Sequence, residues 1–434
     1  MLYRCAVALA LMGPVLPASA AEPDGDPQTP YPGITYTRWR DASGPVRIHV
    51  VEVDLSSAEI DLVATAPTQR GATPSAFAAA AGAVVAVNGD YFRPAGFGPA
   101  GLARGQSATW AGTRDDDVSG LVSFYKDVEG TKVTLSRPEQ VVDSLEERVV
   151  GAVGGRPLLV QGGAAVTSFA CEDRIAMACD VAPRTAVAVA ADRRTLWLVV
   201  VDGWQADSLG MTAAQLGRFL AADLGAGDAL LLDGGSASAM SFDGQLVTSP
   251  SDGVERAVAN HLAVRYGTLP PGTVKGVVKE RNVETGESIA GATVTLDDGR
   301  TLTYGGDDLW VFEVAPRWVC VTATAAGYHT GTTCRQARSG EEIYASIALF
   351  PDADFIDAGP GQADPDAAPT GEPDAAAPLD AAATGGEVDA GGGARGDSGG
   401  CGVAGAGRAG PTGLILAGLI LSRVRRRAAR SRSR

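Results

Sequence analysis

Two aspartates that directly follow apolar runs are the residues of this chain best suited to acid–base chemistry. Asp233 follows the run Ala229–Leu232, and Asp202 follows the run Leu196–Val201. Such runs are typical of buried strands, at whose ends ligand-binding side chains gather. A carboxylate pair is also what glycosidases use, one as acid and the other as base or nucleophile. A structural turn or a helix N-cap would use the same residues, and that alternative stays open for both.

Several other polar residues could bind an anionic or polar ligand. An arginine guanidinium pairs with two phosphate oxygens, and an asparagine amide offers both a donor and an acceptor. Glycines let the backbone approach a ligand closely. The candidate substrate-binding residues are Asn88, Arg184, Gly234, Gly235, Ser236, Ser238, Arg256 and Asn260. Surface ion pairs are the alternative for the arginines, and a left-handed Asn-Gly turn is the alternative for Asn88.

Other reaction classes find less support in the sequence. The serines after Asp233 have no accompanying histidine motif, so a serine-hydrolase triad is not expected. The chain has three scattered histidines, His49, His261 and His329, which give no zinc-type spacing. We therefore expect no metal and no cofactor, although an oxygen-only calcium or magnesium site built from aspartates stays open.

The elements around the two aspartates predict how they are positioned. A strand over Leu196–Val201, a helix over Thr212–Asp223 and a strand over Asp228–Leu232 form a βαβ-like unit. The helix starts with the spacing of a capping box. If the two strands are parallel neighbours, Asp202 and Asp233 lie at the same edge of the sheet.

The remaining apolar runs of this first unit also predict strands. They cover residues 46–53, 60–63, 83–87 and 185–190, the last forming a hairpin with 196–201. We predict an α+β (mixed α/β) domain over residues 31–268. From 272 to 350 the pattern changes to short strands at 274–278, 292–296, 310–314 and 318–323, which is typical of an all-β sandwich.

Both ends of the chain predict export and anchoring. Residues 1–21 combine Arg4, an apolar stretch and small residues at 18–21, as a secretory signal does. In an exported protein the close pairs Cys171/Cys179 and Cys320/Cys334 are most simply disulfides. Residues 400–434 contain Cys401, a short apolar segment and an arginine cluster. This tail resembles the C-terminal sorting signals of myxobacterial surface proteins, and a plain tail anchor is the alternative.

One strongly acidic segment contributes to the formal net charge of −15. Residues 351–399 are rich in Ala, Pro, Gly and Asp and have few apolar residues to bury, so we expect a disordered acidic linker. The net charge does not by itself exclude an anionic substrate for the folded part. Nothing in the sequence indicates nucleic-acid binding, and the oligomeric state is left open.

Separated motifs in residues 45–266 together resemble the phosphodiester glycosidase family. The motifs occur in the family's order, and they are Ala86–Phe92, Gly154–Gly163, Pro183–Ala186, Val201–Gly203, Gly210–Thr212, Leu232–Gly235 and Ser249–Asn260. Residues 272–350 similarly resemble the carboxypeptidase-regulatory-like (prealbumin-like) modules of secreted bacterial proteins. The first resemblance implies hydrolysis of a sugar 1-phosphodiester, with Asp233 and Asp202 as the catalytic pair. The good phosphate leaving group leaves open whether both acids are needed.

The motif at Asp233 departs from the family pattern. The family commonly has a serine at the fifth position of this motif, where this chain has Ala237. We therefore keep two hypotheses. The first is an exported, surface-anchored bacterial glycosidase acting on N-acetylglucosamine-like phosphodiesters in glycans or envelope polymers. The second is a surface module that binds phosphorylated glycans without catalysis. A metal-dependent phosphodiesterase is a third and weaker possibility.

Overall fold

The computed structural model describes residues 21–41, 44–114, 118–141 and 144–355. The expected signal peptide, acidic linker and sorting tail lie outside the described residues, apart from Ala21 and residues 351–355. Among the described helices, none has the length and apolar character to cross a membrane.

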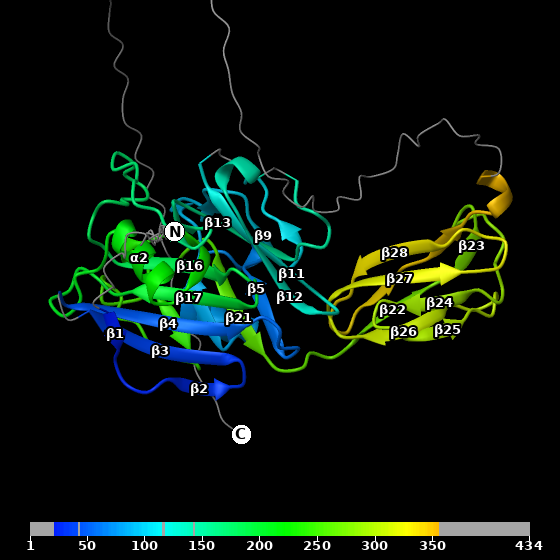
Figure 1. Ribbon diagram of the computed structural model, residues 1–434, viewed down its shortest axis with the longest axis horizontal. Helices are drawn as coiled ribbons and strands as arrows, with labels where there is room; N and C mark the ends of the chain where they lie inside the picture. Colours follow the sequence, from blue (N-terminus) through cyan, green and yellow to red (C-terminus); the bar gives the residue numbers. More distant parts are fainter. Residues whose placement is uncertain (1–20, 42–43, 115–117, 142–143, 356–434) are drawn as a thin grey trace, which may run out of the picture. The chain divides into compact units, whose positions relative to one another are not determined.

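The largest sheet of the first unit has the order β1-β3-β4-β17-β16-β18-β14-β15, with β2 paired to β3. Its strands are β1 (Ala21–Pro23), β2 (Gln28–Tyr31), β3 (Ile34–Asp41), β4 (Val46–Asp54), β14 (Leu158–Gln161), β15 (Ala164–Ala165), β16 (Arg184–Ala190), β17 (Thr195–Val201) and β18 (Ala226–Leu231). The strands expected at 46–53, 185–190 and 196–201 are therefore confirmed, as is the hairpin of β16 with β17. In Figure 1 β4, β17 and β16 lie side by side.

The parallel neighbours of the predicted βαβ-like unit are not present. β17 and β18 run in the same direction, but β16 lies between them and pairs antiparallel with both. Their ends still share one sheet edge, as expected for Asp202 and Asp233. The described part is mostly β with two α-helices, so the mixed α/β character was overestimated. The apolar runs of β16, β17 and β18 have no polar face because these antiparallel strands are buried on both sides.

Two further antiparallel sheets complete the first unit, whose sheets include a curled half-barrel. One has the order β20-β19-β6-β21-β5, with strands β5 (Ile60–Ala64), β6 (Val85–Asn88), β19 (Met240–Phe242), β20 (Gln245–Leu246) and β21 (His261–Tyr266). The other has the order β10-β9-β13-β11-β12, with strands β9 (Arg104–Gly105), β10 (Ala108–Thr109), β11 (Gly120–Asp127), β12 (Gly130–Ser136) and β13 (Gly151–Gly155). A short hairpin joins β7 (Phe92–Arg93) to β8 (Gly98–Pro99).

One apolar core holds these three sheets together. Alternate residues of β16 point to opposite faces, so Val187 joins this central core while Ala186 faces helix α2 (Ala213–Ala222). α2 packs Leu216 and Phe219 into the second cluster, and it starts at Thr212 with the predicted capping box. Helix α1 (Pro74–Ala81) covers the other side of the β6 sheet. The strand ends that carry the site are thus fixed by burial on both faces.

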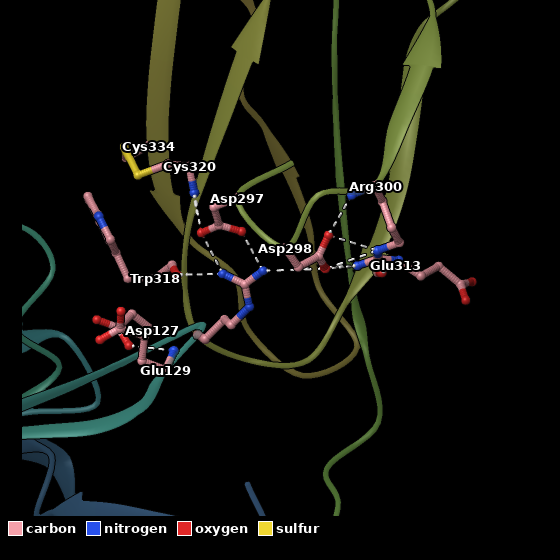
Figure 2. A network of polar contacts seen from close by, with 10 residues as sticks. Asp127, Glu129, Asp297, Asp298, Arg300, Glu313, Trp318, Cys320 and Cys334 are labelled. Atoms are coloured by element: carbon pink, nitrogen blue, oxygen red, sulfur yellow. Dashed lines mark hydrogen bonds and ion pairs between the residues drawn. A yellow bond between two sulfur atoms is a disulfide. The ribbon is translucent and has the colours of Figure 1, made fainter. Parts of the chain in front are cut away.

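Residues 272–349 contain only strands and surround a hydrophobic core of their own. Its strands are β22 (Gly272–Gly276), β23 (Val278–Glu280), β24 (Thr293–Leu296), β25 (Thr301–Thr303), β26 (Trp310–Val314), β27 (Trp318–Thr324), β28 (Gly331–Gln336), β29 (Glu342–Tyr344) and β30 (Ile347–Leu349). Figure 2 shows Asp297 beside Cys320, whose backbone N–H donates to Asp297 Oδ2 at 3.0 Å. Arg317 Nη1 donates to the same oxygen at 2.7 Å. Both predicted disulfides, Cys171–Cys179 and Cys320–Cys334, are present.

Short 3-10 turns connect several of these elements. They are η1 (Pro67–Gln69), η2 (Pro138–Gln140), η3 (Gly235–Ala237) and η4 (Asp352–Phe355). η3 directly follows Asp233, so the backbone turns sharply as soon as the chain leaves β18.

Candidate active site

Asp233 lies where the ends of two strands from different sheets meet. Its backbone N–H donates to the Gly89 carbonyl at 2.9 Å, and its own carbonyl accepts from Asn88 Nδ2 at 2.7 Å. Asn88 ends β6, whereas Asp233 follows β18. These two bonds fix the main chain of Asp233 from both sides, so the position from which its side chain projects is also fixed.

Asn88 is fully buried and its amide is used internally. Besides the bond to Asp233, its Oδ1 accepts from Thr185 Oγ1 at 2.7 Å and from the Ala239 N–H at 3.3 Å. The side chain therefore ties β6 to β16 and to the Asp233 loop. This geometry favours a positioning role for Asn88 over the substrate contact expected from sequence.

Asn260 closes the same junction from the start of β21. The Gly89 N–H donates to the Asn260 carbonyl, and the Asp90 N–H donates to Asn260 Oδ1, both at 2.8 Å. A Cβ on Gly89 would lie 2.4 Å from that Oδ1, so only glycine fits here. Among the described residues the buried Nδ2 of Asn260 has no hydrogen-bond partner.

Asp90 supplies a second carboxyl group at this junction. Its Oδ2 accepts from the Gly101 N–H at 2.7 Å, and the residue is buried. A Cβ on Gly154 would lie 2.8 Å from Oδ2, so the glycine of β13 makes room for the carboxylate. The sequence motif Asn88-Gly89-Asp90 contained this acid, but residue type alone did not single it out.

Asp233 has an unusually high pKa for an aspartate. The pKa of Asp233 is raised to about 7, chiefly by burial and also by the Asp90 charge, while the Gly234 N–H and Arg256 act to lower it. The Gly234 N–H donates to its Oδ1 at 2.9 Å. Because Asp233 is partly exposed, its carboxyl group can exchange protons with a ligand near neutral pH.

Positive charge borders the two acids. The Arg256 side chain is 52% exposed and forms an ion pair with Asp252 at 3.6 Å, so it can turn to an incoming anion. Arg156 lies over the Tyr91 ring, 5.7 Å from its centre, and the Tyr91 hydroxyl donates to the Arg156 carbonyl. Burial raises the pKa of Tyr91, as do the charges of Asp233 and Asp90, so Tyr91 stays protonated.

Arg184 is placed differently from the sequence expectation. Its buried guanidinium donates to the backbone carbonyls of Met211, Ala176, Met177 and Asp180, at 2.6 to 3.0 Å. Three of these carbonyls belong to or follow the loop closed by the Cys171–Cys179 disulfide. Arg184 thus organises that loop, and the geometry favours this structural role over phosphate binding.

Asp202 shares the sheet edge with Asp233 but is bound elsewhere. Its buried carboxylate lies 3.2 Å from His49 Nε2 and 3.3 Å from Arg47 Nε, and it accepts from the Ser249 N–H. The charges that act on the Asp233 pKa include Asp90 and Arg256, not Asp202. The structure therefore brings Asp90 rather than Asp202 to Asp233.

The residues after Asp233 form a tight backbone turn. Gly235 adopts a φ of +61°, and its N–H donates to the Pro183 carbonyl. Ser236 is partly exposed, whereas Ala237 and Ser238 are buried, and Ser238 Oγ has no partner among the described residues. Ser236 is thus the hydroxyl of this turn that a ligand can reach. Within the described chain, no three His, Cys, Asp or Glu side chains gather as a metal site would require.

The part of the chain that contains the candidate site matches a known protein family. Residues 81–265 match the model of the phosphodiester glycosidase family, a stretch that contains Asn88, Asp90, Asp202, Asp233 and Arg256. The uncharacterized SPbeta prophage-derived protein YomE of Bacillus subtilis is 37% identical over 84 residues, which are 19% of this chain and 13% of YomE.

Two solved structures are among those found similar to this chain. The catalytic domain of zebrafish N-acetylglucosamine-1-phosphodiester alpha-N-acetylglucosaminidase, auto-inhibited by its pro-peptide, shares 22% identity over 57% of this chain and 88% of that chain, with a TM-score of 0.43. A hypothetical protein from Synechocystis shares 18% identity over 56% of this chain and 64% of that chain, with a TM-score of 0.42.

Proposed function

We propose that this protein hydrolyses sugar 1-phosphodiesters, releasing an N-acetylglucosamine-like sugar from a glycan or an envelope polymer. The observation that carries the proposal is the partly exposed Asp233 carboxyl group, which lies near Asp90 and has a pKa of about 7. Hydrogen bonds at both the N–H and the carbonyl group of Asp233 hold its main chain in place. It lies within the stretch that matches the phosphodiester glycosidase family.

Asp233 acts as the general base in this proposal. The oxygen of a water molecule attacks the anomeric carbon while the bond from that carbon to the phosphate oxygen breaks. The water proton passes to Asp233, and the bonding electrons leave with the phosphate monoester. Phosphate is a good leaving group, so a second carboxyl group is not required as acid. Asp90 raises the basicity of Asp233 instead.

The remaining groups bind the two halves of the substrate. Arg256 neutralises the phosphate, because it is exposed and already acts on the charge of Asp233. The partly exposed Ser236 hydroxyl is a donor for the sugar, whereas the buried Asn260 belongs to the framework. Asn88 and Arg184 hold the framework. We assign Asp202 to that framework as well, although the sequence motif favoured it as a catalytic residue.

Export and surface anchoring form part of the same proposal. Two disulfides support an oxidising compartment, because such bonds persist outside the cytoplasm. The signal and the tail that would direct the chain there lie outside the described residues. We propose that the β-sandwich at 272–350 is an accessory module.

The test is release of free sugar by the purified chain. Both anomers of N-acetylglucosamine 1-(methyl phosphate) and of two other hexoses are offered, with and without a chelator. We expect turnover of one anomer, loss of at least about 100-fold in Asp233→Asn, and no loss in Asp228→Asn. Asp228 is the matched control, an aspartate of the same strand β18 paired with Arg193.

The binding-module hypothesis keeps one observation in its favour, the buried Ala237 in place of the family serine. It predicts saturable binding of the same phosphodiesters without sugar release over long incubation. A rate that disappears with chelator and returns with calcium or magnesium would instead support the metal-dependent alternative.

A further inference from the structure

Trp204 is an exposed aromatic residue on a strained backbone. It follows Asp202 and Gly203 in the loop from β17 to α2, and 50% of its surface is exposed. Its φ is +58°, a left-handed conformation that bulky residues rarely adopt. Such strain persists where the surrounding structure enforces it, and it gathers at functional sites.

The loop that carries Trp204 is held by many hydrogen bonds. The Trp204 N–H donates to the Leu209 carbonyl at 3.1 Å, and Gln205 Nε2 donates to the Ser249 carbonyl at 2.6 Å. The indole Nε1 donates to the Val181 carbonyl at 3.1 Å. The bond to Nε1 fixes the direction of the ring, so the exposed indole is oriented before any ligand arrives.

The indole lies against the turn that follows Asp233. A Cβ on Gly235 would be 2.9 Å from Cη2 of Trp204 and 3.3 Å from Cζ3. The ring edge therefore contacts the backbone two residues beyond the carboxyl group. Gly235 is required here twice, by this contact and by its own φ of +61°. An exposed, preoriented aromatic ring thus borders the candidate active site.

We propose that Trp204 is a stacking platform for a pyranose ring of the substrate, an inference that rests on the proposed function. A pyranose has an apolar face of C–H bonds, which carry partial positive charge, and the indole face is electron-rich. The polar edge of the same sugar would remain free for Asp233 and the Ser236 hydroxyl. Exposed Val181 and Leu209, whose carbonyls bind Trp204, extend the apolar surface beside the ring.

Binding is measured separately from turnover, in full-length Asp233→Asn protein titrated with N-acetylglucosamine 1-(methyl phosphate). We expect the Kd to rise at least about tenfold when Trp204→Ala is added, and less with Trp204→Phe, which keeps an aromatic face. The sugar should change tryptophan fluorescence in the parent and in the control Trp318→Phe, but not in Trp204→Phe. Trp318 is a half-buried tryptophan of β27, in the separate all-β core.

Turnover in the active chain gives an independent readout. Trp204→Ala should raise KM about tenfold while leaving the pH midpoint of kcat/KM unchanged, because stacking does not alter the Asp233 environment. If Trp204→Ala leaves the Kd within twofold of the parent value, the platform is overturned. It is also overturned if octyl phosphate, which has no sugar, binds as tightly as the sugar phosphodiester and loses the same affinity in Trp204→Ala. Sugar binding through Trp204 without any turnover would overturn the proposed function alone, whereas turnover indifferent to Trp204 would overturn only the platform.

Discussion

Acidifying the assay should switch off hydrolysis by protonating Asp233. The carboxyl group must be ionised to accept a proton from water, and burial together with Asp90 raises the pKa of Asp233 to about 7. The rate should therefore rise with pH through neutrality. This direction belongs to a base, since a general acid would lose activity over the same range.

The size of the effect follows from the shifted pKa. With a midpoint near 7, about 1% of Asp233 is ionised at pH 5 and about 90% at pH 8. We expect kcat/KM to fall about 90-fold between pH 8 and pH 5. An aspartate at the ordinary value of 3.8 would be more than about 90% ionised at pH 5, and the profile would be almost flat.

Neighbouring charges should move the midpoint in opposite directions. The Asp90 charge disfavours ionisation of Asp233, so Asp90→Asn should lower the midpoint. Arg256 favours the ionised form, so Arg256→Gln should raise the midpoint as well as the KM for the phosphodiester. Asp228→Asn, the control on β18, should leave the profile of the parent unchanged.

The assay records kcat/KM from pH 5 to pH 8.5 at constant ionic strength, with circular dichroism at each pH. A phosphodiester keeps one negative charge across this range, so the pH profile reports the ionisation of groups in the protein and not of the substrate. A flat profile in folded protein would refute the shifted pKa, and a rate that rises on acidification would refute the assignment of Asp233 as base.

Three further predictions concern the framework of the site. Asp233→Asn should be up to about 4 kcal/mol more stable than the parent at pH 8 and equally stable at pH 3. The reason is that between pH 3.8 and about 7 the folded parent keeps a proton on Asp233 that the unfolded chain has lost. Thermal unfolding at both pH values tests this, and equal Tm shifts at the two pH values would contradict it. Gly89→Ala should destabilise by at least about 2 kcal/mol in urea titrations, because its Cβ would meet Asn260, whereas Gly98→Ala, which faces open space, should not. Arg184→Met should lower the Tm and speed proteolysis near the Cys171–Cys179 loop, because four carbonyls lose their donor; a normal Tm with a raised KM would instead restore Arg184 as a phosphate ligand.

Local sequence patterns were enough to find the elements but not their pairing. The capping box at Thr212 and the apolar runs of β4, β16 and β17 are encoded within a few residues, so they were predicted correctly. The antiparallel insertion of β16 between β17 and β18 depends on contacts between segments far apart in the chain. A wholly apolar strand looks the same in either kind of sheet.

The same limit explains which site residues were found. Asp233 could be proposed from the sequence because its own motif carries the relevant residue types. Arg184 and Asn88 have the right chemistry for a ligand, but their hydrogen-bonding groups are taken up by partners 4 to 151 residues away. Residue type shows what a side chain can bind, and only the fold shows whether that capacity is already used. Trp204 was overlooked because the motif considered ended at Gly203.

The choice between Asp202 and Asp90 shows that lying at the same sheet edge is weaker evidence for proximity to Asp233 than lying at the same junction of two sheets. β17 and β18 are separated by β16, so their ends lie two strand spacings apart, roughly 10 Å. Asp202 is also held by Arg47 and His49, and both of these residues belong to β4, which lies on the far side of β17 from β18. β6 comes from another sheet and meets β18 end to end through the bond between Asp233 and Gly89. The second carboxyl group at Asp233 therefore comes from a sheet that strand order alone would not have connected to it, and for this reason changing Asp90 should move the pH profile while changing Asp202 should affect stability.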